Sequence, residues 1–158
     1  MTEKAFQYAE KAHGVQMYGD KPYVYHLAAA VAVLRDFGFN DDVMISAGWL
    51  HDTVEDTHAT IEDIDREFGE EVAELVWAVT GIGENRKERN ESIHRKITAY
   101  PRAAISKTAD CIANVESAKV WQPRLFAMYQ KEGGDFITLV EDKIPAAMLT
   151  RLKEALQV

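Results

Sequence analysis

The sequence has few of the features that mark secreted or membrane-spanning proteins. It contains one cysteine, Cys111, so no disulfide can form within the chain, and we expect a cytoplasmic location. The longest uninterrupted apolar run, residues 27–34, has eight residues, whereas a membrane-spanning helix needs about 20. Residues 1–13 mix charged and apolar groups, unlike a signal peptide. We therefore expect no membrane association.

Positive charge is also scarce, with 18 Lys and Arg against 26 Asp and Glu and a formal net charge of −8. Such a chain lacks the broad basic surface that binds phosphate backbones, so nucleic acid is not an expected partner. What the sequence does have is 158 residues, 47% of them hydrophobic. This length and composition suit one hydrophobic core. We expect a single domain over residues 1–158, with no room for a second catalytic domain.

Strand-like alternation is nearly absent, whereas helical spacing of apolar residues recurs along the chain. The pattern predicts helices over residues 3–13, 23–37, 41–55, 61–68, 70–79, 92–100 and 102–121. Residues 14–22 and 81–91 are predicted to be exposed connections, because turn formers fill the first and apolar residues are rare in the second. Breaks at Pro123, Gly133-Gly134 and Pro145 divide the tail into three helical pieces. The predicted fold is all-α, with eight or nine helices.

The strongest local signal for chemistry is the run His51-Asp52-Thr53-Val54-Glu55-Asp56. On one continuous helix, His51 and Glu55 would lie four residues apart, as would Asp52 and Asp56, so their side chains would emerge from one surface. Carboxylates gathered at the end of an apolar helix repel one another unless a proton or cation joins them. The run therefore indicates a divalent metal. The alternative is that His51 and Asp52 only end the helix, with Glu55 and Asp56 as surface acids.

Two other segments can complete such a site. His26 stands among apolar residues of the second predicted helix, where a histidine can also be a satisfied core group. The long helix over 102–121 carries one polar line between two apolar lines, formed by Lys107, Asp110, Asn114 and Ser117. Such a line is typical of a cleft wall, the alternative being a polar contact between helices.

If these helices pack together, His26, His51, Asp52 and Asp110 supply two imidazoles and two carboxylates. A ligand set without thiolates suits a borderline or moderately hard metal with positions open for water and substrate. We predict one Mn²⁺ per chain. Cys111 is predicted to point away from the site and into the core.

The chain resembles the HD superfamily of metal-dependent phosphohydrolases, and within it the hydrolase domains of RelA/SpoT proteins, including the metazoan SpoT homologues. The matching pieces run from residue 5 to about 120: Ala12-His13 with Gln16, Pro22-Tyr23 with His26, Leu50 to Thr57, Phe68-Gly69, Val79-Thr80 and Lys107 to Asn114. The resemblance implies a helical domain that holds Mn²⁺ through His26, His51, Asp52 and Asp110. It also implies release of pyrophosphate from the 3′ position of guanosine tetra- or pentaphosphate, (p)ppGpp.

The same resemblance implies roles for further residues. Glu55 is similar to the family's general acid/base, and Asp56 would position either Glu55 or the attacking water. Asn114 and Ser117 would contact ribose or phosphate, and Tyr129 would contact phosphate. Lys107 would offset phosphate charge or brace the acidic residues.

The loop over residues 14–22 departs from the family pattern. RelA/SpoT hydrolase domains carry an Arg-Lys pair and a longer loop here, whereas this chain reads Gln16-Met17-Tyr18-Gly19-Asp20-Lys21, with Lys21 as the only basic residue. Tyr18 is expected either to stack on a base or to pack on the first helix. Three functions therefore stay open: a (p)ppGpp hydrolase, a hydrolase of another nucleotide such as the 2′-phosphate of NADPH, and a nucleotide-binding regulator without turnover.

Overall fold

The computed structural model describes all of residues 1–158 and confirms an all-α fold. Nine helices have eight or more residues, and α4 is a single turn of four. The helices are α1 (Thr2–His13), α2 (Val24–Asp36), α3 (Asp42–Leu50), α4 (Thr53–Asp56), α5 (Ile61–Phe68), α6 (Glu70–Ala78), α7 (Arg86–Ala99), α8 (Ala103–Trp121), α9 (Pro123–Val140) and α10 (Ala146–Leu156). No helix combines the length and hydropathy needed to cross a membrane.

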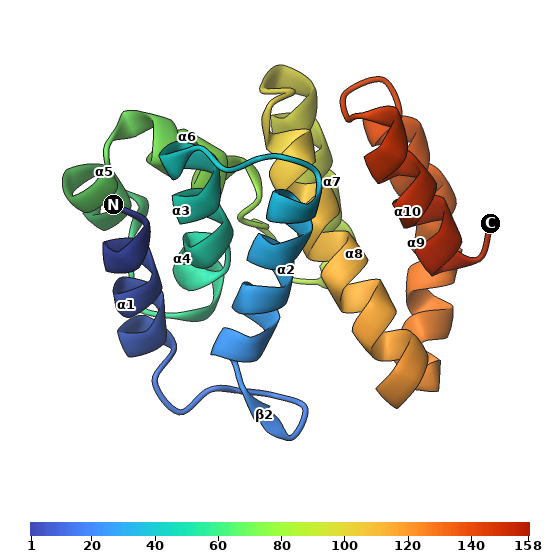
Figure 1. Cartoon of the computed structure of the whole chain (residues 1–158), viewed down its shortest axis with the longest axis horizontal. Coiled ribbons are helices and arrows are strands. Elements are labelled where there is room, and N and C mark those ends of the chain that lie inside the picture. Colours follow the sequence, from blue (N-terminus) through green and yellow to red (C-terminus); the bar gives the residue numbers. More distant parts are fainter.

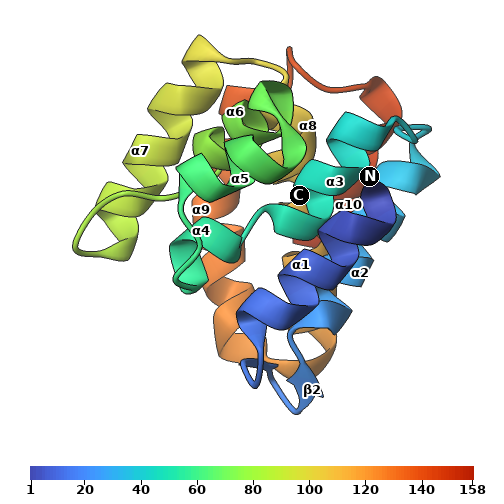
Figure 2. The same ribbon diagram turned by 90° about the vertical axis from the view of Figure 1, so that its left-hand side faces the viewer.

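The helices pack side by side across the molecule. α1 packs on α3, α3 on α2, α2 on the long helix α8, and α8 on the α9–α10 pair (Figure 1). Figure 2 shows α7 at one edge of the molecule, away from the turn that joins α1 to α2. The central helix α8 therefore joins the N-terminal helices to the C-terminal pair.

A glycine brings α2 and α3 unusually close. A Cβ atom added to Gly48 would lie 2.9 Å from Leu34 Cδ1 and 3.1 Å from Val31 Cγ2, so a larger residue would push the two helices apart. The close approach also sets two histidines side by side, because His51 follows α3 directly and His26 lies in the first turn of α2. Their ring centroids are 5.3 Å apart.

Two predicted helix starts are confirmed by their caps. The Asp41 side chain accepts a hydrogen bond from the Met44 amide at the start of α3. Thr60 and Asp63 form the reciprocal capping box that starts α5. These bonds satisfy backbone N–H groups that the first turn of a helix leaves without partners.

The prediction of one continuous helix over residues 41–55 is wrong, because the helix is interrupted between α3 and α4. α3 ends at Leu50, whose carbonyl accepts a hydrogen bond from the Thr53 hydroxyl at 2.7 Å, and α4 begins at Thr53. His51 and Asp52 lie in this break. Consequently the acidic residues of the segment do not form two columns on one helix.

Three further expectations require correction. Residues 86–91 belong to α7, because Asn85 caps that helix by accepting from the Glu88 amide at 2.9 Å. Gly133-Gly134 does not divide the tail, since α9 continues through it and Gly133 packs against Leu156 of α10. Residues 17–18 and 21–22 form a two-stranded antiparallel hairpin, β1 (Met17–Tyr18) and β2 (Lys21–Pro22), within the predicted loop.

Candidate metal centre and active-site cavity

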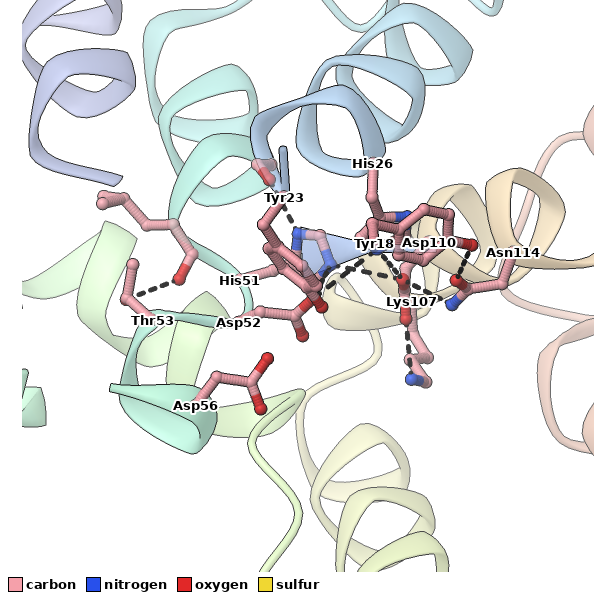
Figure 3. A network of polar contacts seen from close by, with 12 residues as sticks. Tyr18, Tyr23, His26, His51, Asp52, Thr53, Asp56, Lys107, Asp110 and Asn114 are labelled. Carbon is pink, nitrogen blue, oxygen red and sulfur yellow. Dashed lines mark hydrogen bonds and ion pairs between the residues drawn. The ribbon is translucent and has the colours of Figure 1, made fainter. Parts of the chain in front are cut away.

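Four side chains from distant parts of the sequence meet at one place: His26, His51, Asp52 and Asp110 (Figure 3). One potential ligand atom from each lies within 4.8 Å of the others. Nε2 of His26 is 3.0 Å from Asp110 Oδ1, and Nε2 of His51 is 3.0 Å from Asp52 Oδ2. The structure therefore brings together the four residues that the sequence predicts as metal ligands.

Three separate elements deliver these groups. His26 lies in the first turn of α2, Asp110 in the middle of α8, and His51 and Asp52 in the break between α3 and α4. His51 is only 3% exposed, and the Asp52 side chain makes no capping bond to α4. The alternative in which this pair only ends a helix in solvent does not describe the structure.

The orientation of His51 tests whether the cluster suits a cation. Its Nδ1 lies 2.7 Å from the carbonyl oxygen of Gly48, which can only accept, so we assign the hydrogen to Nδ1. Its Nε2 lone pair then faces carboxylate oxygens of Asp52 and Asp110, and a cation or proton is needed between these acceptors. Metal-ligating histidines characteristically anchor their second nitrogen in this way. Two imidazoles and two carboxylates therefore fit a divalent ion.

The electrostatics of the cluster favour added positive charge. Burial lowers the pKa of His51, but the carboxylates of Asp52 and Asp110 outweigh it and raise that pKa well above its usual value. Burial raises the pKa of both acids, yet both pKa values lie below the ordinary range. The positive charges of Lys107 and His51 lower the pKa of Asp110. The pKa of Asp52 is lowered chiefly by His51. Both acids are thus held as carboxylates.

Neighbouring polar groups fix both carboxylates. Lys107 Nζ donates to Asp110 Oδ2 at 2.8 Å, and Asn114 Nδ2 donates to Asp110 Oδ1 at 3.0 Å. The Tyr23 hydroxyl donates to Asp52 Oδ2 at 2.6 Å. Of the two roles expected for Lys107, these contacts favour bracing the acidic residues.

The cluster borders a cavity of about 1190 Å³. Its lining includes Asp52, Asp110, Lys107 and Asn114 on the cluster side, together with residues of α7, α9 and the segment 80–83. Cys111 also contributes to this lining, although we expected it in the core; it is half-buried and packs against core residues as well. Burial raises the pKa of the Cys111 thiol to about 12.

Glu55 and Asp56 both line this cavity beside the cluster. Burial, with the nearby Asp52 carboxylate, raises the pKa of Glu55. A Cβ atom on Gly81 would lie 2.9 Å from Glu55 Oε1, so the glycine gives this carboxylate its space. Asp56 accepts a hydrogen bond from Gln16 Nε2 at 3.2 Å.

The loop residues predicted to contact substrate have different surroundings. Tyr18 lines the cavity and stacks on His26, with ring centroids 4.7 Å apart and planes at 15°, while its hydroxyl donates to Asn114 Oδ1 at 2.7 Å. Ser117 lies outside the lining, near the Tyr18 hydroxyl. Lys21 also lies outside the lining, with its ammonium 5.4 Å from the ring centroid of Tyr25. The hairpin thus presents an aromatic ring to the cavity and no cation.

The basic residues on the opposite wall of the cavity are not among those predicted from the sequence. Arg86, Lys87 and Arg89 of α7 line the cavity, as does the predicted contact residue Tyr129 of α9. The Arg86 guanidinium lies 5.7 Å from the Tyr129 ring centroid and forms two hydrogen bonds with Glu132, at 2.8 and 2.9 Å. The sequence does carry a local signal for this part of α7, because Asn85 is a favourable helix cap and three basic residues follow it within four positions.

The sequence and the structure both resemble known proteins. The family model described as "HD domain" matches residues 5–123. A Mycobacterium leprae protein named probable GTP pyrophosphokinase is 34% identical over 140 residues, which are 84% of this chain. An Aquifex aeolicus protein named guanosine-3′,5′-bis(diphosphate) 3′-pyrophosphohydrolase is 35% identical over 126 residues, or 76% of this chain.

The structural match extends further than the curated sequence matches. A protein described as a metazoan orthologue of SpoT that hydrolyses ppGpp superposes with a TM-score of 0.88, at 26% identity, over 99% of this chain and 93% of its own. By contrast, the chain spans only about a fifth of the length of the two curated relatives, 18% in each case. The family match covers most of the chain and includes all four clustered residues. The chain belongs to the HD-domain family.

Proposed function

We propose that this chain is a Mn²⁺-dependent hydrolase that removes pyrophosphate from the 3′ position of (p)ppGpp, as one catalytic domain acting in the cytoplasm. The observation that carries the proposal is the convergence of His26, His51, Asp52 and Asp110 at a cavity that also contains Glu55. The names of the Aquifex relative and of the metazoan structure support the same substrate.

The four clustered residues would hold the cation through two nitrogen and two oxygen atoms. When bound, a divalent cation lowers the pKa of a water molecule and neutralises charge that develops on phosphoryl oxygens. Tyr23, Lys107 and Asn114 keep the two carboxylates in place through the hydrogen bonds described above.

Glu55 is suited to move the proton in this reaction. Its raised pKa brings the carboxylate closer to neutral pH, where a general base exchanges protons most effectively. Glu55 would take a proton from the attacking water and return it to the leaving 3′-oxygen. Water adds to phosphorus, the bond from phosphorus to the 3′-oxygen breaks, and GDP or GTP and pyrophosphate leave.

The outer wall of the cavity is suited to hold the rest of a charged nucleotide. Arg86, Lys87 and Arg89 supply positive charge there, although the chain as a whole is acidic. Tyr129 and Tyr18 offer aromatic surfaces, and Asn114, whose amide bonds to Asp110 and Tyr18, keeps one N–H for ribose or phosphate. A polyphosphate substrate would thus meet local positive charge despite the net charge of −8.

The hairpin favours a second candidate substrate. No cation of the loop lines the cavity, since Lys21 lies over Tyr25, and an aromatic ring alone discriminates poorly between bases. A nucleotide with another base and a terminal phosphate, such as NADPH with its 2′-phosphate, would meet the same cluster and cations.

The test is to incubate the Mn²⁺-loaded protein separately with ppGpp, pppGpp and NADPH and to quantify pyrophosphate and orthophosphate. Pyrophosphate and GDP in equal amounts from ppGpp are the expected result. Orthophosphate from NADPH alone would establish the second candidate. Binding of these nucleotides with no product would overturn both in favour of a regulator.

A further inference from the structure

A buried histidine and a glutamine connect α1 to the acidic segment of the cavity. His13 is the last residue of α1 and is 7% exposed. Its Nδ1 lies 2.8 Å from Gln16 Oε1, and Gln16 Nε2 donates to Asp56 Oδ2 at 3.2 Å. None of the four clustered residues takes part in this chain of hydrogen bonds, so the mechanism above leaves it unused.

Chemistry allows only one arrangement of these hydrogen bonds. A carboxylate only accepts, so the amide of Gln16 must turn its NH₂ group toward Asp56 and its oxygen toward His13. The hydrogen of His13 must then be on Nδ1, which donates to that oxygen. His13 Nε2 is left buried without a partner, which is consistent with a nitrogen that bears only a lone pair.

The backbone holds Gln16 in place from both sides. Its N–H donates to the carbonyl of His13 at 2.9 Å, and its carbonyl accepts from the Tyr23 N–H at 3.1 Å, which closes the base of the hairpin. The His13 ring stacks on Tyr23, with centroids 4.6 Å apart. The amide of Gln16 therefore projects from a fixed point toward α4.

The acidic segment needs such support from outside. α4 has only four residues, fewer than an isolated helix requires for stability, and Asp56 is exposed at its end. An exposed aspartate samples several rotamers, and holding one of them costs entropy. Figure 3 shows the Asp56 side chain extending from α4 toward the side where Asp52 and the other clustered residues lie. Because Tyr23 holds Asp52 and Gln16 holds Asp56, both ends of the segment 52–56 depend on the α1–α2 connection.

We propose that Gln16, oriented by His13, is a positioning residue that fixes the Asp56 carboxylate for catalysis. This inference rests on the proposed hydrolytic function. Gln16 acts only through Asp56, so its loss lowers kcat while metal affinity stays unchanged. His13 acts only through Gln16. Residue 13 therefore needs only a hydrogen-bond donor at the position of Nδ1 to support activity.

The variants separate these requirements. Gln16→Leu removes the amide and leaves a slightly shorter apolar side chain, and we expect kcat to fall about tenfold to a hundredfold, as when a hydrogen-bond partner of a metal ligand is removed. His13→Asn places an amide donor near the position of Nδ1 and should keep most of the activity. His13→Gln places its amide near the position of Nε2 and should behave like Gln16→Leu. Melting temperatures and Mn²⁺ affinities are measured for every variant, because a purely structural role would lower both kcat and stability for His13→Asn and His13→Gln alike.

The closing experiment is a double-mutant cycle on kcat with Gln16→Leu and Asp56→Ala, together with the side-chain amide NMR signal of Gln16 in metal-free protein. Alanine leaves no acceptor for Gln16, so we expect Gln16→Leu to have no further effect in the Asp56→Ala background, and the Gln16 amide signal to move in Asp56→Ala but not in Glu55→Gln. Additive losses, or an amide signal indifferent to Asp56, would overturn the positioning role. An inactive wild-type protein would instead overturn the proposed function, and the amide signal would still decide whether Gln16 binds Asp56.

Discussion

The two sides of the cavity are built differently. On the cluster side, Asp110 has a side chain that is 7% exposed and shares its oxygens among Lys107, Asn114 and two histidines. On the outer side, Arg86 is 46% exposed and Glu132 is 33% exposed, and their ion pair joins α7 to α9 at this wall. The buried side is fixed by several simultaneous bonds, whereas the outer side can exchange a protein contact for a substrate contact. This difference predicts that cluster variants lose metal and kcat, and that outer-wall variants change KM.

The largest effect is expected from Asp110→Ala. The substitution removes one ligand and leaves the ammonium of Lys107 without its partner inside the protein, so Mn²⁺ binding should be lost and kcat should fall at least about a thousandfold. Isothermal titration with Mn²⁺ measures the first effect and product release the second. Asp65→Ala on the exposed side of α5 is the control and should match the wild type. Full activity of chelator-treated Asp110→Ala would contradict the ligand assignment.

Glu55→Gln comes next and separates proton transfer from metal binding. The amide keeps the shape of the side chain but exchanges no proton, so we expect kcat to fall about a hundredfold to ten-thousandfold while Mn²⁺ affinity is retained. In the wild type, kcat/KM should fall as the pH drops through the raised pKa of Glu55, because only the carboxylate can accept the proton. If kcat/KM of the Glu55→Gln variant fell in the same way as the pH drops, the general base would be another residue.

Tyr23→Phe removes the hydrogen bond to Asp52, a proposed metal ligand, and leaves Asp52 itself in place. Loss of the hydroxyl frees Asp52 Oδ2, and we expect Mn²⁺ affinity to fall about tenfold to a hundredfold. Tyr25→Phe is the matched control, since Tyr25 is 57% exposed and contacts Lys21. Equal Mn²⁺ affinities for the two variants would show that Asp52 keeps its place without Tyr23.

The smallest effect is expected from Arg86→Ala on the outer wall. An exposed ion pair contributes about 1 kcal/mol or less to stability, so the melting temperature should change little. If the guanidinium contacts substrate, KM should rise several-fold with kcat unchanged. A fall in kcat with KM unchanged would move Arg86 from substrate binding to the chemical step.

The same contrast explains how much could be predicted from the sequence. The four clustered residues were identified because residue types with metal-binding chemistry recur in a pattern that resembles a known family. The predicted starts of α3 and α5 are confirmed, because the caps at Asp41 and Thr60 are formed by a few neighbouring residues. Such features depend on short stretches of sequence.

The remaining features depend on contacts between distant segments. The helix end at Leu50 depends on the pairing of His51 with α8 and of Asp52 with α2, which the local sequence does not show. Gly133 resembles a helix end in the sequence, yet it is the small residue that lets α9 approach Leu156. The ion pair of the outer wall depends on such a contact too, because Arg86 and Glu132 are 46 positions apart.

The central claim is that one divalent cation, held by the four clustered residues, is required for hydrolysis. It is tested most directly by titrating chelator-treated protein with Mn²⁺ while pyrophosphate release from ppGpp is followed. We predict no release without metal and a rise that saturates at one Mn²⁺ per chain, with no rise in the Asp110→Ala variant. Undiminished pyrophosphate release from the chelator-treated wild type would contradict the account.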